Sequence, residues 1–257
     1  NDSVLEGFTI ENGTGTPVAF WTFGGGIYCS DASPTISGNI IKNNYCNADG
    51  GGIYCRIDSS PVITGNSIFD NTADWYAGGG IACYDSSPTI TGNTIQGNTA
   101  GSGGGGIKCQ DCIATISGNT ITSNNCSDPG GGINFEGSAA TIEGNTISRN
   151  ISGGKGGGID GSGDLTITDN TLEGNDASGD GGGICAAGDD LTIAGNVLTG
   201  NYSGGEGGAV YATGVAAVID GNTVHGNISY GDGGGVFCGS QQAAITSSSI
   251  SWNWSYS

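Results

Sequence analysis

The chain has no methionine, five basic residues, one histidine and no long apolar run. It begins Asn-Asp-Ser, so we expect that an initiator and a signal peptide have been removed and that the protein is extracellular or displayed at a cell surface. No apolar stretch approaches the ~18 residues of a membrane span, so membrane insertion is not expected. The 24 acidic residues give a net charge of -19, which disfavours nucleic acid and favours cations, neutral glycans or proteins as partners.

Helical periodicity is also absent, and a different period takes its place. An apolar residue follows each glycine run, and successive copies are 26, 28, 26, 26, 26, 25, 26 and 26 residues apart. These residues are Ile27, Ile53, Ile81, Ile107, Ile133, Ile159, Ile184, Val210 and Val236. A fixed period of this size indicates a stack of units that share one core.

Each unit contains three short stretches rich in β-branched residues. In one copy they are 81–83, 89–91 and 94–96, separated by Gly, Asn, Ser and Pro, which is typical of strands and turns. A propeller blade would need four antiparallel strands and about 40 residues. The pattern therefore predicts an all-β protein, a right-handed parallel β-helix solenoid of about nine coils of ~26 residues with three short parallel strands per coil.

Two motifs resemble a known family. The first is Gly207-Gly208-Ala209-Val210, with GGGI or GGGV in the other copies, and the second recurs at 68–71, 95–98, 121–124 and 147–150, from Ile to Asn. The chain is similar to right-handed parallel β-helix proteins of the pectin-lyase-like group, and its units resemble the GGA(I/L/V) and FxxN repeats of polymorphic outer-membrane adhesins. The resemblance implies the fold and suggests an adhesive role.

We expect residues 1–257 to form a single β-helix domain, with 1–23 an imperfect first coil and 249–257 a final partial coil. Neither end contains an obvious cap, and an uncovered rung invites edge pairing. Either the chain is a piece of a longer one with neighbouring domains, or copies self-associate end to end into a fibre. Trp252, Trp254 and Tyr256 are the predicted end contact.

Alternation along the first strand predicts which columns face outward. The residue after each aligned Ile or Val should face solvent, so we expect a contact strip that includes Tyr28, Tyr54, Tyr211 and Phe237. The next residue should face inward, which stacks cysteines at successive rungs: Cys29, Cys55, Cys83 and Cys109. This spacing allows disulfides between Cys29 and Cys55 and between Cys83 and Cys109, or a ladder of free thiols.

Asparagine occupies two further columns, five residues apart. We interpret both as hydrogen-bonded ladders at the bends. If the second column faces outward, some members are also candidates for N-glycosylation, because they precede x-Ser or x-Thr. The glycosylation candidates, which include two residues outside the ladders, are Asn12, Asn125, Asn150, Asn201, Asn227 and Asn253.

Acidic residues give a weaker site hypothesis. Asp164, Asp189 and Asp190 should lie one rung apart, with Asp160 on the adjoining face. Such carboxylates would bind Ca²⁺, the one cofactor we consider, or act as an acid-base pair in a polysaccharide lyase or glycoside hydrolase of the pectin-lyase-like group. Another row, which includes Asp31, Asp58, Asp85 and Asp111, is better interpreted as turn residues.

Outward threonines raise a third alternative. The second strands have T-x-T or T-x-S pairs, as in an ice-binding solenoid, at 35/37, 89/91, 115/117 and 166/168. Threonine is common in any exposed strand, however. We therefore expect a non-catalytic extracellular rod, either a fibre subunit or a segment of a surface adhesin, with the enzyme and the ice-binding protein as alternatives.

Overall fold

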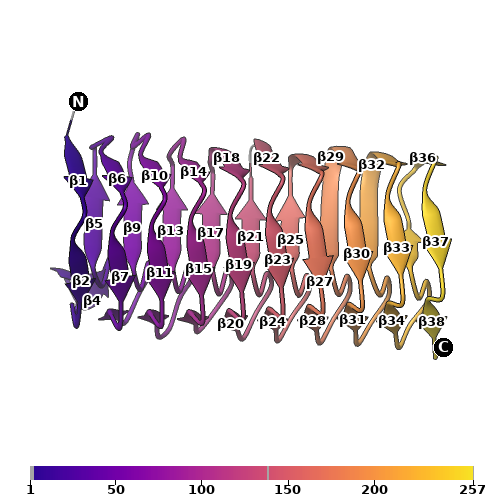
Figure 1. Ribbon diagram of the computed structural model, residues 1–257, viewed down its shortest axis with the longest axis horizontal. Helices are drawn as coiled ribbons and strands as arrows, with labels where there is room; N and C mark the ends of the chain where they lie inside the picture. Colours follow the sequence, from indigo (N-terminus) through magenta and orange to yellow (C-terminus); the bar gives the residue numbers. More distant parts are fainter. Residues whose placement is uncertain (1–2, 138, 257) are drawn as a thin grey trace.

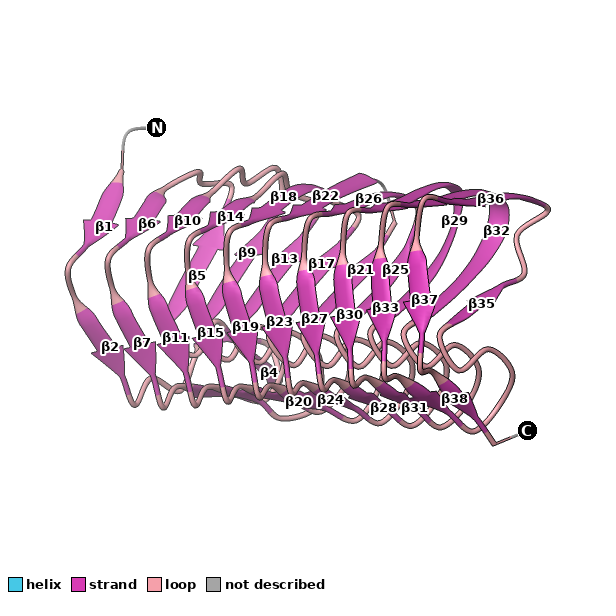
Figure 2. Ribbon diagram, turned by 45° about the vertical axis from the view of Figure 1, so that its right-hand side comes forward, coloured by secondary structure: helices cyan, strands magenta, loops and turns pink. Residues whose placement is uncertain are grey.

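A computed structural model of the protein describes residues 3–137 and 139–256, and it contains strands and no helix in these ranges. The strands stack into a rod, with the two ends of the chain at opposite ends (Figure 1). Successive coils add rungs to three long parallel sheets, of 17, 10 and 9 strands. The sheets enclose a common interior (Figure 2), so the predicted parallel β-solenoid is confirmed.

The 17-stranded sheet contains the first two strands of each coil. The first strands are β5 (Ile27–Ser30), β9 (Ile53–Arg56), β13 (Ile81–Tyr84), β17 (Ile107–Gln110), β21 (Ile133–Glu136), β25 (Ile159–Ser162) and β35 (Val236–Cys238). The second strands are β1 (Val4–Glu6), β6 (Thr35–Ser37), β10 (Val62–Thr64), β14 (Thr89–Thr91), β18 (Ile113–Ser117), β22 (Ala139–Glu143), β26 (Asp164–Thr168) and β36 (Gln242–Thr246). In two late coils the first and second strands merge into β29 (Ile184–Ala194) and β32 (Val210–Asp220).

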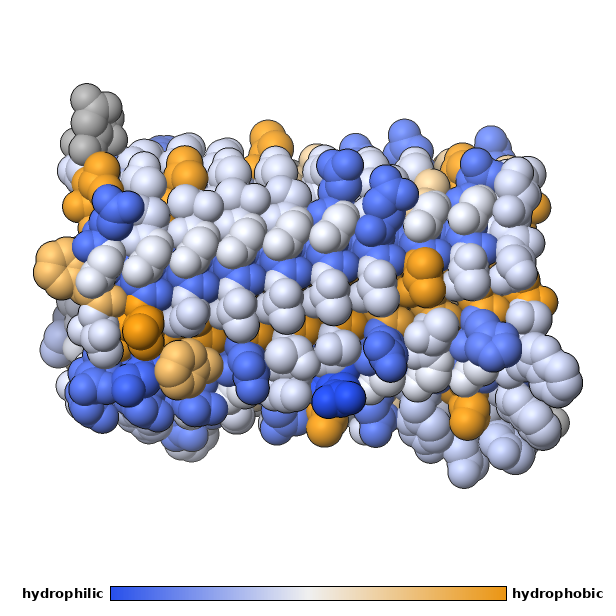
Figure 3. All heavy atoms as spheres, viewed as in Figure 1, coloured by the Kyte–Doolittle hydropathy of each residue, from blue (hydrophilic) through white to orange (hydrophobic). Residues whose placement is uncertain are grey.

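The ten-stranded sheet contains the third strands. These are β2 (Thr9–Glu11), β7 (Ile40–Lys42), β11 (Ser67–Phe69), β15 (Thr94–Gln96), β19 (Thr120–Thr122), β23 (Thr146–Ser148), β27 (Thr171–Glu173), β30 (Val197–Thr199), β33 (Thr223–His225) and β37 (Ser249–Ser251). Their side chains form rows that run along the rod axis (Figure 3).

The nine-stranded sheet contains two-residue strands in a segment that lies outside the three predicted strands of each coil. These are β8 (Tyr45–Cys46), β12 (Thr72–Ala73), β16 (Thr99–Ala100), β20 (Asn125–Cys126), β24 (Ile151–Ser152), β28 (Asp176–Ala177), β31 (Tyr202–Ser203), β34 (Ile228–Ser229) and β38 (Trp254–Ser255). A two-residue strand is too short to show the alternation of inward and outward side chains in the sequence. In the structure each of these strands is aligned by parallel pairing with the equivalent strands of the neighbouring coils.

The first coil departs from the repeat in its second half. β1 and β2 pair in parallel with β6 and β7, as in later coils. The chain then forms an antiparallel hairpin of β3 (Thr16–Val18) and β4 (Trp21–Phe23). The imperfection expected in residues 1–23 therefore lies in this hairpin.

The core consists of stacked aliphatic side chains. In the second strands Ile63 pairs with Ile90 and Ile90 with Ile116, and all three are fully buried. Third-strand isoleucines such as Ile95 form an equivalent buried stack. Burying each such side chain contributes roughly 1.5–3 kcal/mol, so the same gain is repeated in every coil.

Glycines before the first strand are required by close backbone approach. A Cβ on Gly79 would lie 2.5 Å from the Gly105 carbonyl oxygen in the next coil, and Gly78 has φ of +69°. Any larger residue at Gly79 would push neighbouring coils apart.

The two asparagine columns form the predicted ladders, and they lie inside the rod. The Asn98 amide Nδ2 donates to the Asn124 Oδ1 and to the Ile68 carbonyl oxygen, each at 3.0 Å. The Asn98 Oδ1 accepts from the backbone N and from the Nδ2 of Asn71, also at 3.0 Å. The left-handed backbone conformation at each bend belongs to the residue before the asparagine, for example Gly92 or Gly97, and not to the ladder asparagine itself.

Replacing one ladder asparagine should therefore be costly. Asn98→Ala would leave the Asn71 N–H and the Ile68 carbonyl without their partner, and each unsatisfied buried group costs ~1–3 kcal/mol. We expect the free energy of unfolding to fall by about 3 kcal/mol or more in denaturant titrations. Asn125→Ala, at an exposed position of the adjoining strand, should change it by less than about 0.5 kcal/mol. Equal effects of the two substitutions would contradict the ladder's role.

Candidate functional site

The predicted aromatic contact strip on the first strands is covered by the rod's own chain. Tyr54 is 5% exposed, and Tyr28, Tyr211 and Phe237 are half-buried. The Tyr54 ring packs between those of Tyr28 and Tyr84, with centroids 5.6 and 5.7 Å apart. The prediction of a solvent-facing strip is therefore wrong at Tyr54.

The cover consists of the glycine turns. A Cβ on Gly50 would lie 2.7 Å from the Cβ of Tyr54, and one on Gly130 would lie 2.5 Å from that of Asn134. The turn thus lies directly on the outer side of the strand that follows it. The sequence does contain a signal for this cover, since a glycine stands four residues before each member of the column. A glycine has no side chain, so its backbone can approach a neighbouring side chain closely.

Polar residues in this covered column form a hydrogen-bonded chain that the sequence reasoning missed. Lys108 is 4% exposed, and its Nζ lies 2.7 Å from Glu136 Oε1 and donates to the Asn134 Oδ1. Asn134 Nδ2 donates to Asp160 Oδ2 at 2.8 Å, and Asp160 also contacts the Cys185 thiol. A buried lysine is thereby linked to two carboxylates over three rungs.

Burial raises the pKa of Asp160 from 3.8 to about 6, and the hydrogen bond from Cys185 opposes that shift. The Glu136 carboxylate adds to it, while Lys108 and Lys155 oppose it. Lys155 itself pairs with Asp180 at 2.8 Å. Asp160 is therefore a half-buried titrating group in the covered column, separate from the exposed Asp164, Asp189 and Asp190.

Three of the predicted glycosylation sites are inaccessible. Asn150, Asn201 and Asn227 are fully buried, and their amide groups are bonded within the second ladder. A glycan at any of them would break the ladder, so the condition for glycosylation, an outward-facing second column, is not met at these three residues. Asn253 is half-buried and bonded to Asn227. Asn12 and Asn125 are exposed.

The predicted cysteine column is present as free thiols. Cys29, Cys55, Cys83 and Cys109 stand at paired positions of β5, β9, β13 and β17, and all four are buried and free. Of the two alternatives that the sequence allowed, the structure shows the ladder of free thiols, and neither of the possible disulfides is formed. The thiols act here as small apolar residues of the core.

The acidic residues proposed as a calcium site are divided between different places. Asp164 and Asp190 lie on neighbouring strands, since Leu165 pairs with Leu191, and both are exposed, as is Asp189. Asp160 lies in the covered column. Within residues 3–137 and 139–256, no group of three or more metal-ligating side chains is gathered, which contradicts the four-residue calcium cluster.

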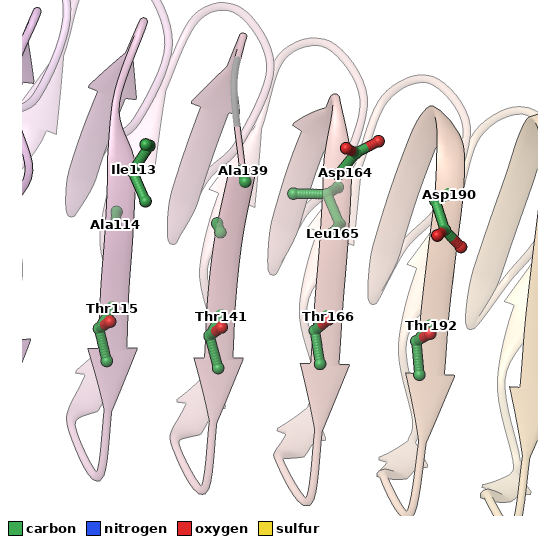
Figure 4. A pocket seen from close by; sticks show the side chains of 11 residues that line it. Ile113, Ala114, Thr115, Ala139, Thr141, Asp164, Leu165, Thr166, Asp190 and Thr192 are labelled. Carbon is green, nitrogen blue, oxygen red and sulfur yellow. The ribbon is translucent and has the colours of Figure 1, made fainter.

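A groove lies beside Asp164 and Asp190 on the face of the second strands (Figure 4). It has a volume of about 240 Å³. Its floor is aliphatic, with Ala114, Ala140 and Leu165. A row of threonines from four successive strands borders it, namely Thr115, Thr141, Thr166 and Thr192.

A second hollow of about 360 Å³ continues this groove and shares Ile113 with it. It is lined by Asp58, Asp85 and Asp111. These aspartates have φ of 51°, 47° and 53°, which confirms the interpretation that they are turn residues. We call the two hollows together the lateral groove; five carboxylates line it, from Asp58, Asp85, Asp111, Asp164 and Asp190.

The three predicted end-contact residues are exposed. Trp252, Trp254 and Tyr256 are more than half exposed near the last rung. The single histidine, His225, is exposed, and its Nδ1 lies 3.1 Å from Ser251 Oγ.

No helix in the described part of the chain is long and apolar enough to cross a bilayer.

The raised pKa of Asp160 predicts a pH dependence of stability. Between pH ~4 and ~6 the folded protein retains a proton that the unfolded chain has released, so the free energy of unfolding should fall as pH rises through this range. Asp160→Asn should remove about 2 kcal/mol of that decrease and make the protein more stable at pH 7. Denaturant titrations of both proteins from pH 4 to 7 measure this, and parallel curves would contradict the assignment.

Comparison with known proteins supports the fold directly. A family model described as the right handed beta helix region matches residues 1–147 and 79–250. No curated protein and no solved structure matches the chain significantly. Because the two matches together span nearly all of the repeats, the chain belongs to the right-handed β-helix family.

Proposed function

We propose that this chain is a non-catalytic extracellular rod that presents an adhesive surface, as part of a surface adhesin or of a fibre. The main support is the continuity of its ladders. Isoleucine and asparagine columns continue through successive coils, and each coil bonds to the next through identical contacts. Such a stack resists bending and holds surface groups at fixed positions.

The lateral groove is the adhesive surface that this proposal favours. It runs along the rod beside several coils, so it suits an extended ligand. Its five carboxylates, on a chain of net charge -19, attract a positively charged polymer and repel an acidic one. The threonine hydroxyls offer additional hydrogen bonds to sugar hydroxyls.

Open strand edges give the rod a means of extension. β37 and β38 are terminal strands of their sheets in the described part of the chain. A parallel edge of this kind can pair with a further coil or with a second rod. Both arrangements would place lateral grooves in line along a longer fibre.

A hydrolase or lyase is the second candidate. The observation in its favour is the placement of Asp164 and Asp190 on neighbouring strands beside a groove, since two carboxylates can act as acid and base on a polysaccharide. In that case the chain would release new reducing ends or unsaturated sugars from a polymer.

Chitosan, a cationic polysaccharide, tests the adhesive proposal. We expect the protein to be retained on chitosan beads at low ionic strength and released as salt screens the charges. Asp164→Asn/Asp190→Asn should weaken retention at least threefold. The matched control Glu173→Gln/Asp189→Asn changes net charge equally, at exposed positions that do not line the groove, and should bind like the wild type.

Equal loss in both variants would show that only net charge matters and would contradict the groove. Product release from the polysaccharide by the wild type, abolished in Asp164→Asn/Asp190→Asn, would instead establish the enzyme.

A further inference from the structure

Five exposed or half-exposed aromatic side chains gather near one end of the rod. They are Tyr202, Tyr230, Trp252, Trp254 and Tyr256, which we call the aromatic patch. Tyr230 is 56% exposed, Trp252 74%, Trp254 58% and Tyr256 62%. Few surface features of a monomer place so many rings in solvent without a partner to cover them.

The patch is ordered by the stacking of coils. Tyr202, Ile228 and Trp254 are paired positions on β31, β34 and β38. The Tyr230 ring lies 5.7 Å from that of Tyr202 and 5.3 Å from that of Tyr256. The rings of Tyr202, Tyr230 and Tyr256 therefore lie next to one another in three successive coils, with 62° between the ring planes of the first pair and 35° between those of the second.

A further coil stacked on the last rung would leave the patch in solvent. The alternating positions Ser203 and Ser229 point inward and bond to carbonyl oxygens of Gly179 and Gly231. The aromatic positions therefore point away from the sheet. Stacking adds coils along the axis and extends the outer face without covering it.

Charge narrows the choice among ligands. The five residues of the patch carry no formal charge, while the chain as a whole has a net charge of -19. Asp176, at the position paired with Tyr202, borders the patch. Repulsion therefore disfavours a second copy, an acidic polysaccharide and nucleic acid, whereas a neutral polymer meets no electrostatic barrier.

We infer that the aromatic patch binds a neutral polysaccharide. The electron-rich ring faces pack against the C–H faces of successive sugar rings, and the tyrosine hydroxyls bond to sugar hydroxyls. The row of rings along the axis gives a linear glycan several simultaneous contacts. This site is separate from the lateral groove, and its binding should be insensitive to salt.

Affinity electrophoresis in gels that contain glucomannan, xylan or mixed-linkage β-glucan tests the inference. We expect at least one of these neutral polymers to retard the wild type, with little change as ionic strength rises. Tyr230→Ala/Tyr256→Ala should weaken binding at least tenfold, and Tyr230→Phe/Tyr256→Phe should retain most of it because the rings remain. Tyr45→Ala/Tyr76→Ala, at exposed rings far along the rod, is the matched control.

Failure of all three polymers to retard the wild type would overturn the inference. Equal binding by Tyr230→Ala/Tyr256→Ala and the wild type would do the same. Sedimentation of the wild type and of Tyr230→Ala/Tyr256→Ala tests the alternative that a second copy of the chain covers the patch. A dimer that forms in the wild type and is lost in the variant would overturn the glycan assignment in favour of that second copy. Loss of chitosan retention, by contrast, bears on the lateral groove alone.

Discussion

The structure depends on one constraint, that equivalent residues of successive coils lie directly above one another. In a parallel ladder the equivalent positions of neighbouring coils lie side by side, so that asparagine bonds to asparagine and isoleucine packs against isoleucine. The hydrogen bonds of the asparagine side chains depend on this alignment, because the Oδ1 of Asn119 accepts from the Nδ2 of Asn93 and the Nδ2 of Asn119 donates to Asn145. A buried amide is thereby satisfied only when both neighbouring coils are in register.

The same constraint separates scaffold from function. Columns that repeat without change, such as the buried isoleucines and asparagines, hold the stack together. Positions where coils differ are those available for recognition. The lateral groove arises where aspartates and threonines line neighbouring second strands, and the aromatic patch arises where the last coils replace glycine and small polar residues by tyrosine and tryptophan. Each surface therefore combines a regular spacing with a local change of chemistry.

The period, three of the four strands of each regular coil and the two ladders could be predicted from the sequence, because few architectures besides a stacked solenoid accommodate glycine, isoleucine and asparagine at a repeat of ~26 residues. Prediction failed where neighbours outside the strand decide burial. Alternation placed Tyr54 and Lys108 in solvent, yet the glycine turn of the same coil covers them. The sequons at Asn150 and Asn201 matched a local pattern, whereas their burial depends on the ladder. Trp252, Trp254 and Tyr256 of the aromatic patch were predicted from the sequence as an end contact. The full lateral groove and the positions of Tyr202 and Tyr230 beside that contact could not be predicted, because these residues meet only after stacking. The lysine-to-aspartate chain around Asn134 likewise joins residues from three coils.

The central claim is that every coil is held by the same ladder, and amide hydrogen exchange tests it most directly. Backbone N–H groups of the ladder asparagines, such as those of Asn66, Asn119 and Asn170, donate to the Oδ1 of the next coil at 2.9 Å. We predict slow and similar exchange at these positions in all internal coils, with faster exchange in the first and last rungs. Strong protection in a few coils and rapid exchange at the ladder positions of the others would contradict a continuous rod.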